Sequence, residues 1–94
     1  MHIGVPKEIK NHEYRVAIIP SIVRELTDHG HQVFVETNAG SGIDISDNDY
    51  QEAGAIILNT AQEVFQQGNL ILKVKEPQPQ ECAYLNEEKT LFTF

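Results

Sequence analysis

Arg15 and Lys75 are the two side chains of this sequence whose type and position best suit the binding of a small acid. Arg15 ends a polar stretch between two apolar segments, and Lys75 ends an apolar stretch shortly before Pro77. A guanidinium offers a planar fork that matches a carboxylate, and an ammonium is a point charge that can turn toward a neighbouring oxygen. Two such cations at one edge of a sheet would suit a small carboxylic acid. The pattern by itself favours a simpler interpretation, in which Lys75 is a solvated charge at the end of a strand.

The stretch that presents Lys75 predicts a buried strand over residues 70–75. Leu70–Leu72 is a continuous apolar run, which is typical of a parallel strand covered by helices on both faces. Lys73 and Lys75 are two positions apart, so they point the same way in an extended chain. Pro77 has no N–H and cannot continue the ladder. Ligands of open parallel sheets bind just beyond the carboxyl ends of strands, which is where Lys75 is expected.

The rest of the chain alternates between predicted strands and predicted helices. The strands are expected at residues 1–5, 31–36, 55–58, 70–75 and 89–94, and the helices from 20 to just before 30, from 46 to about 54, from 60 to 68, and for a turn or two over 81–85. Pro20 suits a first helical turn, and Ser46 with Asp49 and Thr60 with Glu63 have the spacing of capping boxes. This alternation predicts an α/β fold with a Rossmann-like, mostly parallel sheet flanked by helices in three layers.

Composition and charge narrow the classes of function. The chain has 94 residues, of which 40% are hydrophobic and 22% charged, as expected for one globular domain. Its net charge of −7 argues against nucleic acid and against anionic membrane surfaces as partners. Cys82 is the single cysteine, so no internal disulfide can form and a reducing, cytoplasmic location is expected. No apolar run is long enough to span a membrane, and the first residues do not form a signal peptide.

Three further patterns could indicate a ligand, and each has a simpler explanation. Gly40–Gly42 is similar to the start of a dinucleotide-binding loop, but the third glycine would have to stand where Ile45 is. Residues 44–55 are similar to a calcium loop but lack its glycine and its final glutamate, and the start of a helix explains the acidic residues better. His29 and His31 have no third ligand for a metal ion. Neither a metal site nor a cofactor site is therefore expected within this chain.

Several short motifs follow one another in an order that is typical of a known domain. They are Gly4–Glu8, Asn11–Ala17, Gly30–His31, Ala39–Gly42, Ala53–Ala55 and Leu72–Pro77. Together they resemble the N-terminal domain that alanine dehydrogenases share with the alpha subunits of proton-translocating nicotinamide nucleotide transhydrogenases, over the whole chain. Transhydrogenases tend to have Asn-Ala-Pro where this sequence has Lys75-Glu76-Pro77, and Val-Ser-Phe where it ends Phe92-Thr93-Phe94. At both places the sequence is similar to alanine dehydrogenase.

The resemblance implies a parent enzyme that interconverts L-alanine with pyruvate and ammonia, uses NAD and forms a homo-oligomer. In that family the arginine at the position of Arg15 binds the substrate carboxylate, and the lysine at the position of Lys75 contacts the substrate. Arg15 and Lys75 are accordingly the expected substrate-binding residues. Lys75 is also the expected catalytic residue, because an ammonium can stabilise charge that develops on the reacting oxygen.

The resemblance also implies that residues 1–94 are an N-terminal, substrate-side domain fragment. The family's catalytic histidine, its catalytic aspartate and its glycine-rich NAD loop belong to later sequence. The NAD-binding domain is thus absent from this chain, which alone is expected neither to oxidise alanine nor to bind NAD.

Two other interpretations of the chain stay open at this point. The same domain occurs in the transhydrogenase alpha subunit, where it has no amino-acid substrate and its partner is a membrane subunit. The residues after Phe94 would separate the two families, since Leu-His-Leu favours alanine dehydrogenase. The other alternative is a non-enzymatic α/β module that acts by association, for which a native stop at Phe94 would be the distinguishing feature.

Overall fold

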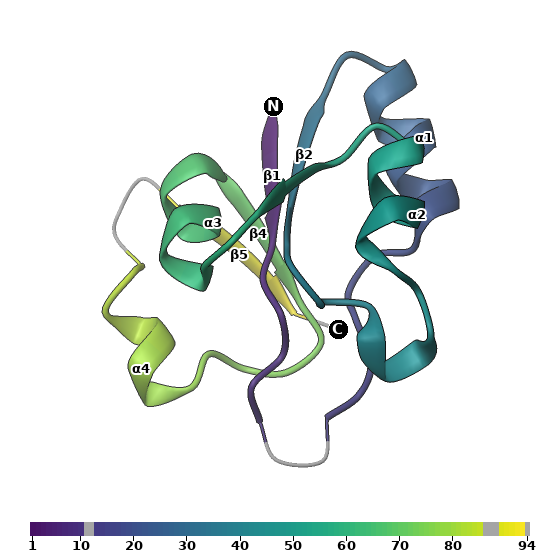
Figure 1. The fold of residues 1–94 in the computed structure, drawn as a ribbon. Helices are drawn as coiled ribbons and strands as arrows, with labels where there is room; N and C mark the ends of the chain where they lie inside the picture. Colours follow the sequence, from purple (N-terminus) through teal and green to yellow (C-terminus); the bar gives the residue numbers. More distant parts are fainter. Residues whose placement is uncertain (11–12, 86–88, 94) are drawn as a thin grey trace.

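One parallel sheet with helices on both faces makes up the fold, as the sequence predicts. The structure is a computed structural model that describes residues 1–10, 13–85 and 89–93. The strands are β1 (His2–Val5), β2 (Gln32–Glu36), β3 (Ile56–Leu58), β4 (Leu70–Lys73) and β5 (Thr90–Thr93). The helices are α1 (Pro20–Asp28), α2 (Asp47–Glu52), α3 (Ala61–Gln67) and α4 (Pro79–Cys82), with a short 3₁₀ turn, η1 (Ser41–Ile43). Figure 1 shows α1 and α2 on one side of the sheet and α3 and α4 on the other.

The strand order, β3-β2-β1-β4-β5, places a topological switch point between β1 and β4. From β1 the chain adds β2 and β3 on one side, and then returns through α3 to add β4 on the other side of β1. All four neighbouring pairs are parallel. In open parallel sheets the crevice beyond the carboxyl ends of the two strands at such a point is the usual place for a ligand. The segments that follow β1 and β4 are therefore the ones to inspect for a site.

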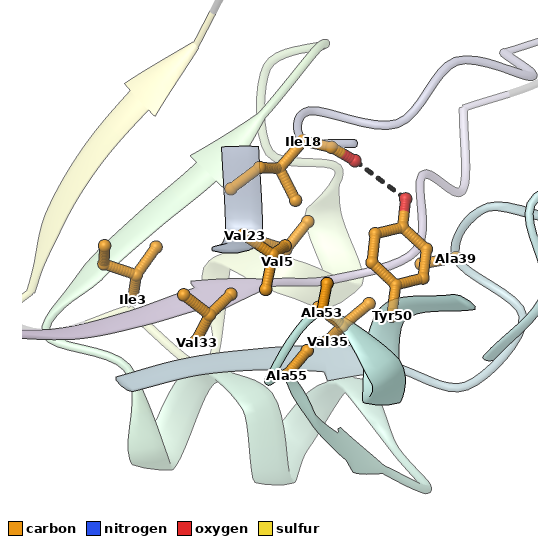
Figure 2. Close-up of a cluster of buried hydrophobic side chains, with 10 residues drawn as sticks. All are labelled: Ile3, Val5, Ile18, Val23, Val33, Val35, Ala39, Tyr50, Ala53 and Ala55. Atoms are coloured by element: carbon orange, nitrogen blue, oxygen red, sulfur yellow. Dashed lines mark hydrogen bonds between the residues drawn. The ribbon is translucent and has the colours of Figure 1, made fainter. Parts of the chain in front are cut away.

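An apolar cluster fills the space between the sheet and the helices α1 and α2 (Figure 2). Its members are Ile3, Val5, Ile18, Val23, Val33, Val35, Ala39, Tyr50, Ala53 and Ala55. Alternate residues of β1 and β2 point into it, as the two-residue period of a strand requires. Tyr50 is completely buried, and its hydroxyl donates a 2.7 Å hydrogen bond to the carbonyl oxygen of Ile18. The cluster joins the first helix, the second helix and the sheet into one core.

Helix α3 packs closely against the opposite face of the sheet. Val64 and Phe65 are its buried residues. A Cβ atom added to Gly4 of β1 would lie 2.9 Å from both the Val64 carbonyl oxygen and the Ile71 side chain. Glycine at this position thus allows the helix to approach the strand, and a larger residue would push α3 away from the switch point.

Of the two predicted capping boxes, one is complete in the structure and the other is present in part. Ser46 and Asp49 form the full capping box at α2, with hydrogen bonds of 3.2 and 3.1 Å. At α3 only half of the predicted box is present: the Thr60 hydroxyl accepts from the Glu63 N–H, but the Glu63 carboxylate accepts from that hydroxyl instead of from a backbone N–H. Gly30 follows α1 with a φ of 88°, which is the left-handed conformation that favours glycine.

The prediction for the end of β4 is wrong. The strand ends at Lys73, not at residue 75, because the next two backbone N–H groups donate to the Glu8 carboxylate rather than to a neighbouring strand. Lys73 is buried, and Lys75 is half-buried and lies beyond the end of the strand. Helix α4 also begins at Pro79, earlier than predicted. The predicted last residue of the fifth strand, Phe94, lies outside the described residues.

Candidate functional site

A cleft of about 410 Å³ lies at the carboxyl edge of the sheet. Two connections form it, the segment that follows β1 and the turn that follows β2. Its charged lining residues are Lys7, Glu8, Lys10, Glu13 and Arg15. A mixed set of cations and carboxylates at this edge suits a small, charged, polar ligand.

Arg15 lines the cleft and is held there by Glu13. The Arg15 Nε and Nη2 atoms donate 3.0 Å hydrogen bonds to the two carboxylate oxygens of Glu13, and the Arg15 backbone N–H donates a third, of 2.9 Å. The Glu13 side chain is only 6% exposed, whereas the Arg15 side chain is 64% exposed. The Nη1 side of the guanidinium takes no part in these bonds. Glu13 therefore fixes one edge of the fork and leaves the other edge for a ligand.

Arg15 and Lys75 both lower the pKa of the Glu13 carboxyl. Hydrogen bonding to Arg15 lowers the pKa of Glu13 from 4.5 to about 2, and the charge of Lys75 adds a smaller contribution in the same direction. The same contact with Glu13 raises the pKa of Arg15. Lys75 does not line the cleft, but its neighbour Val74 lines an adjoining cavity of about 250 Å³ together with Arg15. Arg15 thus lies beside the Glu13 carboxylate, and Lys75 follows the end of β4 at the same edge of the sheet.

Beneath Lys75 lies a group of buried charges, which we call the charge cluster: Glu8, Lys73 and Glu81. The Lys73 ammonium contacts Glu8 Oε1 at 3.1 Å and Glu81 Oε2 at 3.0 Å, and all three side chains are at most 2% exposed. In the part of the chain that the structure describes, every buried side-chain nitrogen and oxygen has a hydrogen-bond partner. Sequence reasoning missed this cluster, since its pairs are 65 and 8 residues apart. The one available signal was a lysine inside an otherwise apolar strand.

Further contacts tie the segment after β1 to its surroundings. Lys10 forms a 2.6 Å salt bridge with Glu76, the residue after Lys75. That hydrogen bond is the main reason why the pKa of Glu76 is lowered. At the other side, the Lys7 backbone N–H donates to the Glu36 carboxylate at 2.9 Å, and partial burial raises the pKa of Glu36. The loop that carries Arg15 is thereby attached to the ends of both β2 and β4.

The acidic residues and histidines that were considered as possible metal ligands form hydrogen bonds within the chain. Asp47 accepts from the Thr37 hydroxyl and the Asn38 backbone, at 2.6 and 2.8 Å, so it organises the turn after β2. His29 Nδ1 lies 2.8 Å from the Glu25 carbonyl oxygen, and His31 Nδ1 lies 3.3 Å from the N-terminal nitrogen. Within residues 1–10, 13–85 and 89–93, no three histidine, cysteine or acidic side chains are arranged to hold a metal ion. The same residues include no helix with the length and apolarity needed to cross a membrane.

Comparisons with a family model and with known proteins match the chain to the same N-terminal domain. Residues 4–94 match the sequence model described as "Alanine dehydrogenase/PNT, N-terminal domain". The chain is 51% identical to an alanine dehydrogenase of Mycolicibacterium smegmatis and 52% identical to one of Halomonas elongata, in each case over all 94 residues and 25% of the relative. The chain thus spans about a quarter of the length of these relatives.

The solved structures that match the fold of the chain include members of both families. An L-alanine dehydrogenase matches all of the chain and 26% of its own, with a TM-score of 0.96 and 47% identity. A transhydrogenase from Sinorhizobium meliloti matches 99% of the chain and 27% of its own, with a TM-score of 0.90 and 32% identity.

Proposed function

The chain belongs to the family of the alanine dehydrogenase/PNT N-terminal domain, and from this premise we propose that it is the substrate-side domain of an NAD-dependent L-alanine dehydrogenase. The full enzyme would catalyse the reversible oxidative deamination of L-alanine to pyruvate and ammonia. Sequence identity supports this choice within the family, because the chain is 47% identical to the solved alanine dehydrogenase and 32% identical to the solved transhydrogenase. A cytoplasmic location and a homo-oligomeric state are part of the same proposal.

The observation that carries the proposal is the pair of cations beside the switch point. Alanine and pyruvate share a carboxylate, and the side of the Arg15 guanidinium that Glu13 leaves unused can bind it through two parallel hydrogen bonds. The substrate keeps that carboxylate throughout the reaction. The contact is therefore similar in the ground state and the transition state, and it should mainly set affinity.

Lys75 has a second role in the proposal. When ammonia adds to pyruvate, the carbonyl oxygen gains negative charge, and a nearby ammonium stabilises it. The half-buried position of Lys75, just past the end of β4, suits this task because partial exclusion of water strengthens a charge interaction. Lys75 would then act in binding and in catalysis, whereas Arg15 would act in binding.

NAD accepts the hydride in this reaction. The glycine pair after β2 is the natural candidate for a phosphate-binding loop. A Cβ atom on Gly42 would lie 2.5 Å from the Tyr14 carbonyl oxygen, and one on Gly40 would lie 2.9 Å from Tyr50 and from Ile45. The two glycines therefore pack closely against other residues of the chain, and they do not form an open loop that could hold a phosphate. We propose that the parent enzyme binds NAD with residues outside this chain.

A transhydrogenase alpha subunit is the second candidate, favoured by the structural match with a TM-score of 0.90. In that protein Lys75 and Arg15 would bind no amino-acid substrate. A non-enzymatic association module is the third. Both alternatives predict that the full-length protein does not oxidise L-alanine with NAD.

Steady-state kinetics of the full-length enzyme tests the proposal. Arg15→Lys keeps the charge but loses the fork, so KM for pyruvate should rise about tenfold with kcat little changed, the cost of one charge-assisted hydrogen bond. Lys75→Met should lower kcat about a hundredfold, since one such donor contributes ~3 kcal/mol. Circular dichroism of each variant must match the parent. A full-length protein without alanine dehydrogenase activity would refute the proposal, and a Lys75→Met kcat within about twofold of the parent would reduce Lys75 to simple binding.

A further inference from the structure

Glu8 is the residue that joins the two strands of the switch point. It follows β1 by three residues, and its carboxylate reaches across to the residues at the end of β4. Glu8 Oε1 contacts the Lys73 ammonium at 3.1 Å and accepts from the Lys75 backbone N–H at 3.2 Å, while Oε2 accepts from the Val74 backbone N–H at 3.1 Å. Both oxygens of one buried carboxylate are therefore used, and two of the three bonds go to the backbone that carries Lys75.

These bonds determine where the chain goes after β4. A strand that continued in the sheet would donate alternate N–H groups to a neighbouring strand. Here two consecutive N–H groups, those of Val74 and Lys75, converge on one carboxylate, which turns the chain out of the sheet. The Lys75 side chain leaves the backbone at this turn. The direction that the chain takes at Lys75 is thus a consequence of the Glu8 carboxylate.

Lys73 supplies the charge that makes this arrangement possible. A buried carboxylate without a cation would carry a large desolvation cost. The Lys73 ammonium is the cation that compensates the charge of Glu8. The Lys73 ammonium takes this structural task, which leaves the Lys75 ammonium for the substrate in the proposed function. Lys73 accordingly compensates the buried charge, and Lys75, two residues later, contacts the substrate in the proposed function.

We propose that Glu8 is a positioning residue for the substrate site, which holds the backbone of Val74 and Lys75 so that the Lys75 ammonium reaches the reacting oxygen of the substrate. The inference rests on the proposed function, in which Lys75 contacts the substrate. It goes further by assigning a role to a carboxylate that touches no substrate, and it predicts that mutation of Glu8 acts through Lys75.

Glu81 offers a matched control within the same cluster. Its carboxylate contacts the same Lys73 ammonium, at 3.0 Å, and is equally buried. Its other oxygen accepts from the Gln78 backbone N–H at the start of α4, and neither of these bonds involves Val74 or Lys75. Glu8→Gln and Glu81→Gln each remove one carboxylate from Lys73. Because glutamine has a single acceptor oxygen, only Glu8→Gln leaves a backbone N–H of the Lys75 turn without its acceptor.

The test is a double-mutant cycle with pyruvate, saturating ammonia and NADH in the full-length enzyme. Glu8→Gln should lower kcat at least tenfold, and Glu81→Gln should leave kcat within about twofold when both are compared at equal folded fraction. In a Lys75→Met background the further effect of Glu8→Gln should fall to within about twofold, since the group it positions is gone. Equal losses for the two glutamine variants, or an undiminished effect of Glu8→Gln in the Lys75→Met background, would overturn the inference.

Amide hydrogen exchange separates failure of this inference from failure of the proposed function. In the 94-residue chain the Val74 and Lys75 amides should be protected, lose that protection in Glu8→Gln and keep it in Glu81→Gln. Unprotected amides in the parent chain would overturn the positioning role on their own. If protection follows this pattern but Lys75→Met leaves kcat unchanged, the role of Lys75 in the proposed function fails, and the positioning role for the substrate fails with it. If Glu8→Gln does not fold, Glu8→Asp replaces it, because its carboxylate keeps the charge but reaches less far.

Discussion

The apolar cluster and the charge cluster are both buried against the same sheet, yet they contribute different things. In the apolar cluster, Val23, Val33 and Val35 are completely buried and are held by contact area alone. In the charge cluster, Lys73 has two partners at defined distances, and one of them also fixes two backbone N–H groups. Apolar contacts are non-directional, whereas hydrogen bonds to a carboxylate are directional. The first region supplies stability, and the second sets the geometry of the site at some cost in stability.

The largest expected effect comes from breaking the charge cluster at its centre. Lys73→Met keeps the volume of the side chain but removes the cation between Glu8 and Glu81. Leaving buried carboxylates uncompensated should lower the free energy of unfolding by about 3–5 kcal/mol. Urea unfolding of the chain measures it, with Lys75→Met as the control at a half-buried lysine. A loss below about 1 kcal/mol would show that the ion pairs do not hold the two carboxylates in place.

A truncation in the apolar cluster should cost less. Val35→Ala removes two buried methyl groups from the centre of Figure 2. At about 0.8 kcal/mol for each buried carbon, plus a small cavity, the expected loss is about 2 kcal/mol. The same urea titration compares it with Lys73→Met. If Val35→Ala were the more costly of the two, the buried carboxylates of the charge cluster would not depend on Lys73 to compensate their charge.

Loss of the Tyr50 side-chain hydrogen bond within the apolar cluster should have a smaller effect again. Tyr50→Phe deletes the hydroxyl that donates to the Ile18 carbonyl oxygen and leaves that oxygen without this donor. We expect a loss of about 1–1.5 kcal/mol. Burial raises the pKa of Tyr50 to about 12, so its ionisation, followed by absorbance, should lie near pH 12. An ordinary midpoint near 10 would indicate that the hydroxyl is solvated.

A contribution to stability that depends on pH is expected where Glu13 holds the exposed Arg15 side chain. The pKa of Glu13 is lowered to about 2 in the folded chain, below its value in an unfolded chain. Its contribution to stability is therefore complete above about pH 4.5 and disappears as the pH falls through about 2. Carbon-detected NMR of the Glu13 carboxyl should show a midpoint near pH 2. A midpoint near 4.5 would mean that Arg15 is not held by this carboxylate in solution.

The difference between the two clusters also explains what the sequence could predict. Strand and helix positions followed from apolar periodicity, from Pro20 and Gly30, and from the Ser46–Asp49 spacing, which are all local signals. The end of β4 was missed because Glu8 determines it from 65 residues or more away. Glu8 was overlooked for the same reason. Glu13 is only two residues from Arg15, but a carboxylate that holds a neighbouring side chain has no sequence pattern of its own. Arg15 and Lys75 were selected by charge and by resemblance, and their roles stay predictions.

The structure of the full-length enzyme with bound pyruvate tests the central claim most directly. The account predicts that the pyruvate carboxylate binds the Arg15 guanidinium on its Nη1 side, away from Glu13, with N···O distances of about 2.7–3.2 Å. It also predicts that Lys75 Nζ lies within hydrogen-bond distance of the pyruvate carbonyl oxygen. Pyruvate bound elsewhere, or at this edge without contact to Arg15 and Lys75, would contradict the account.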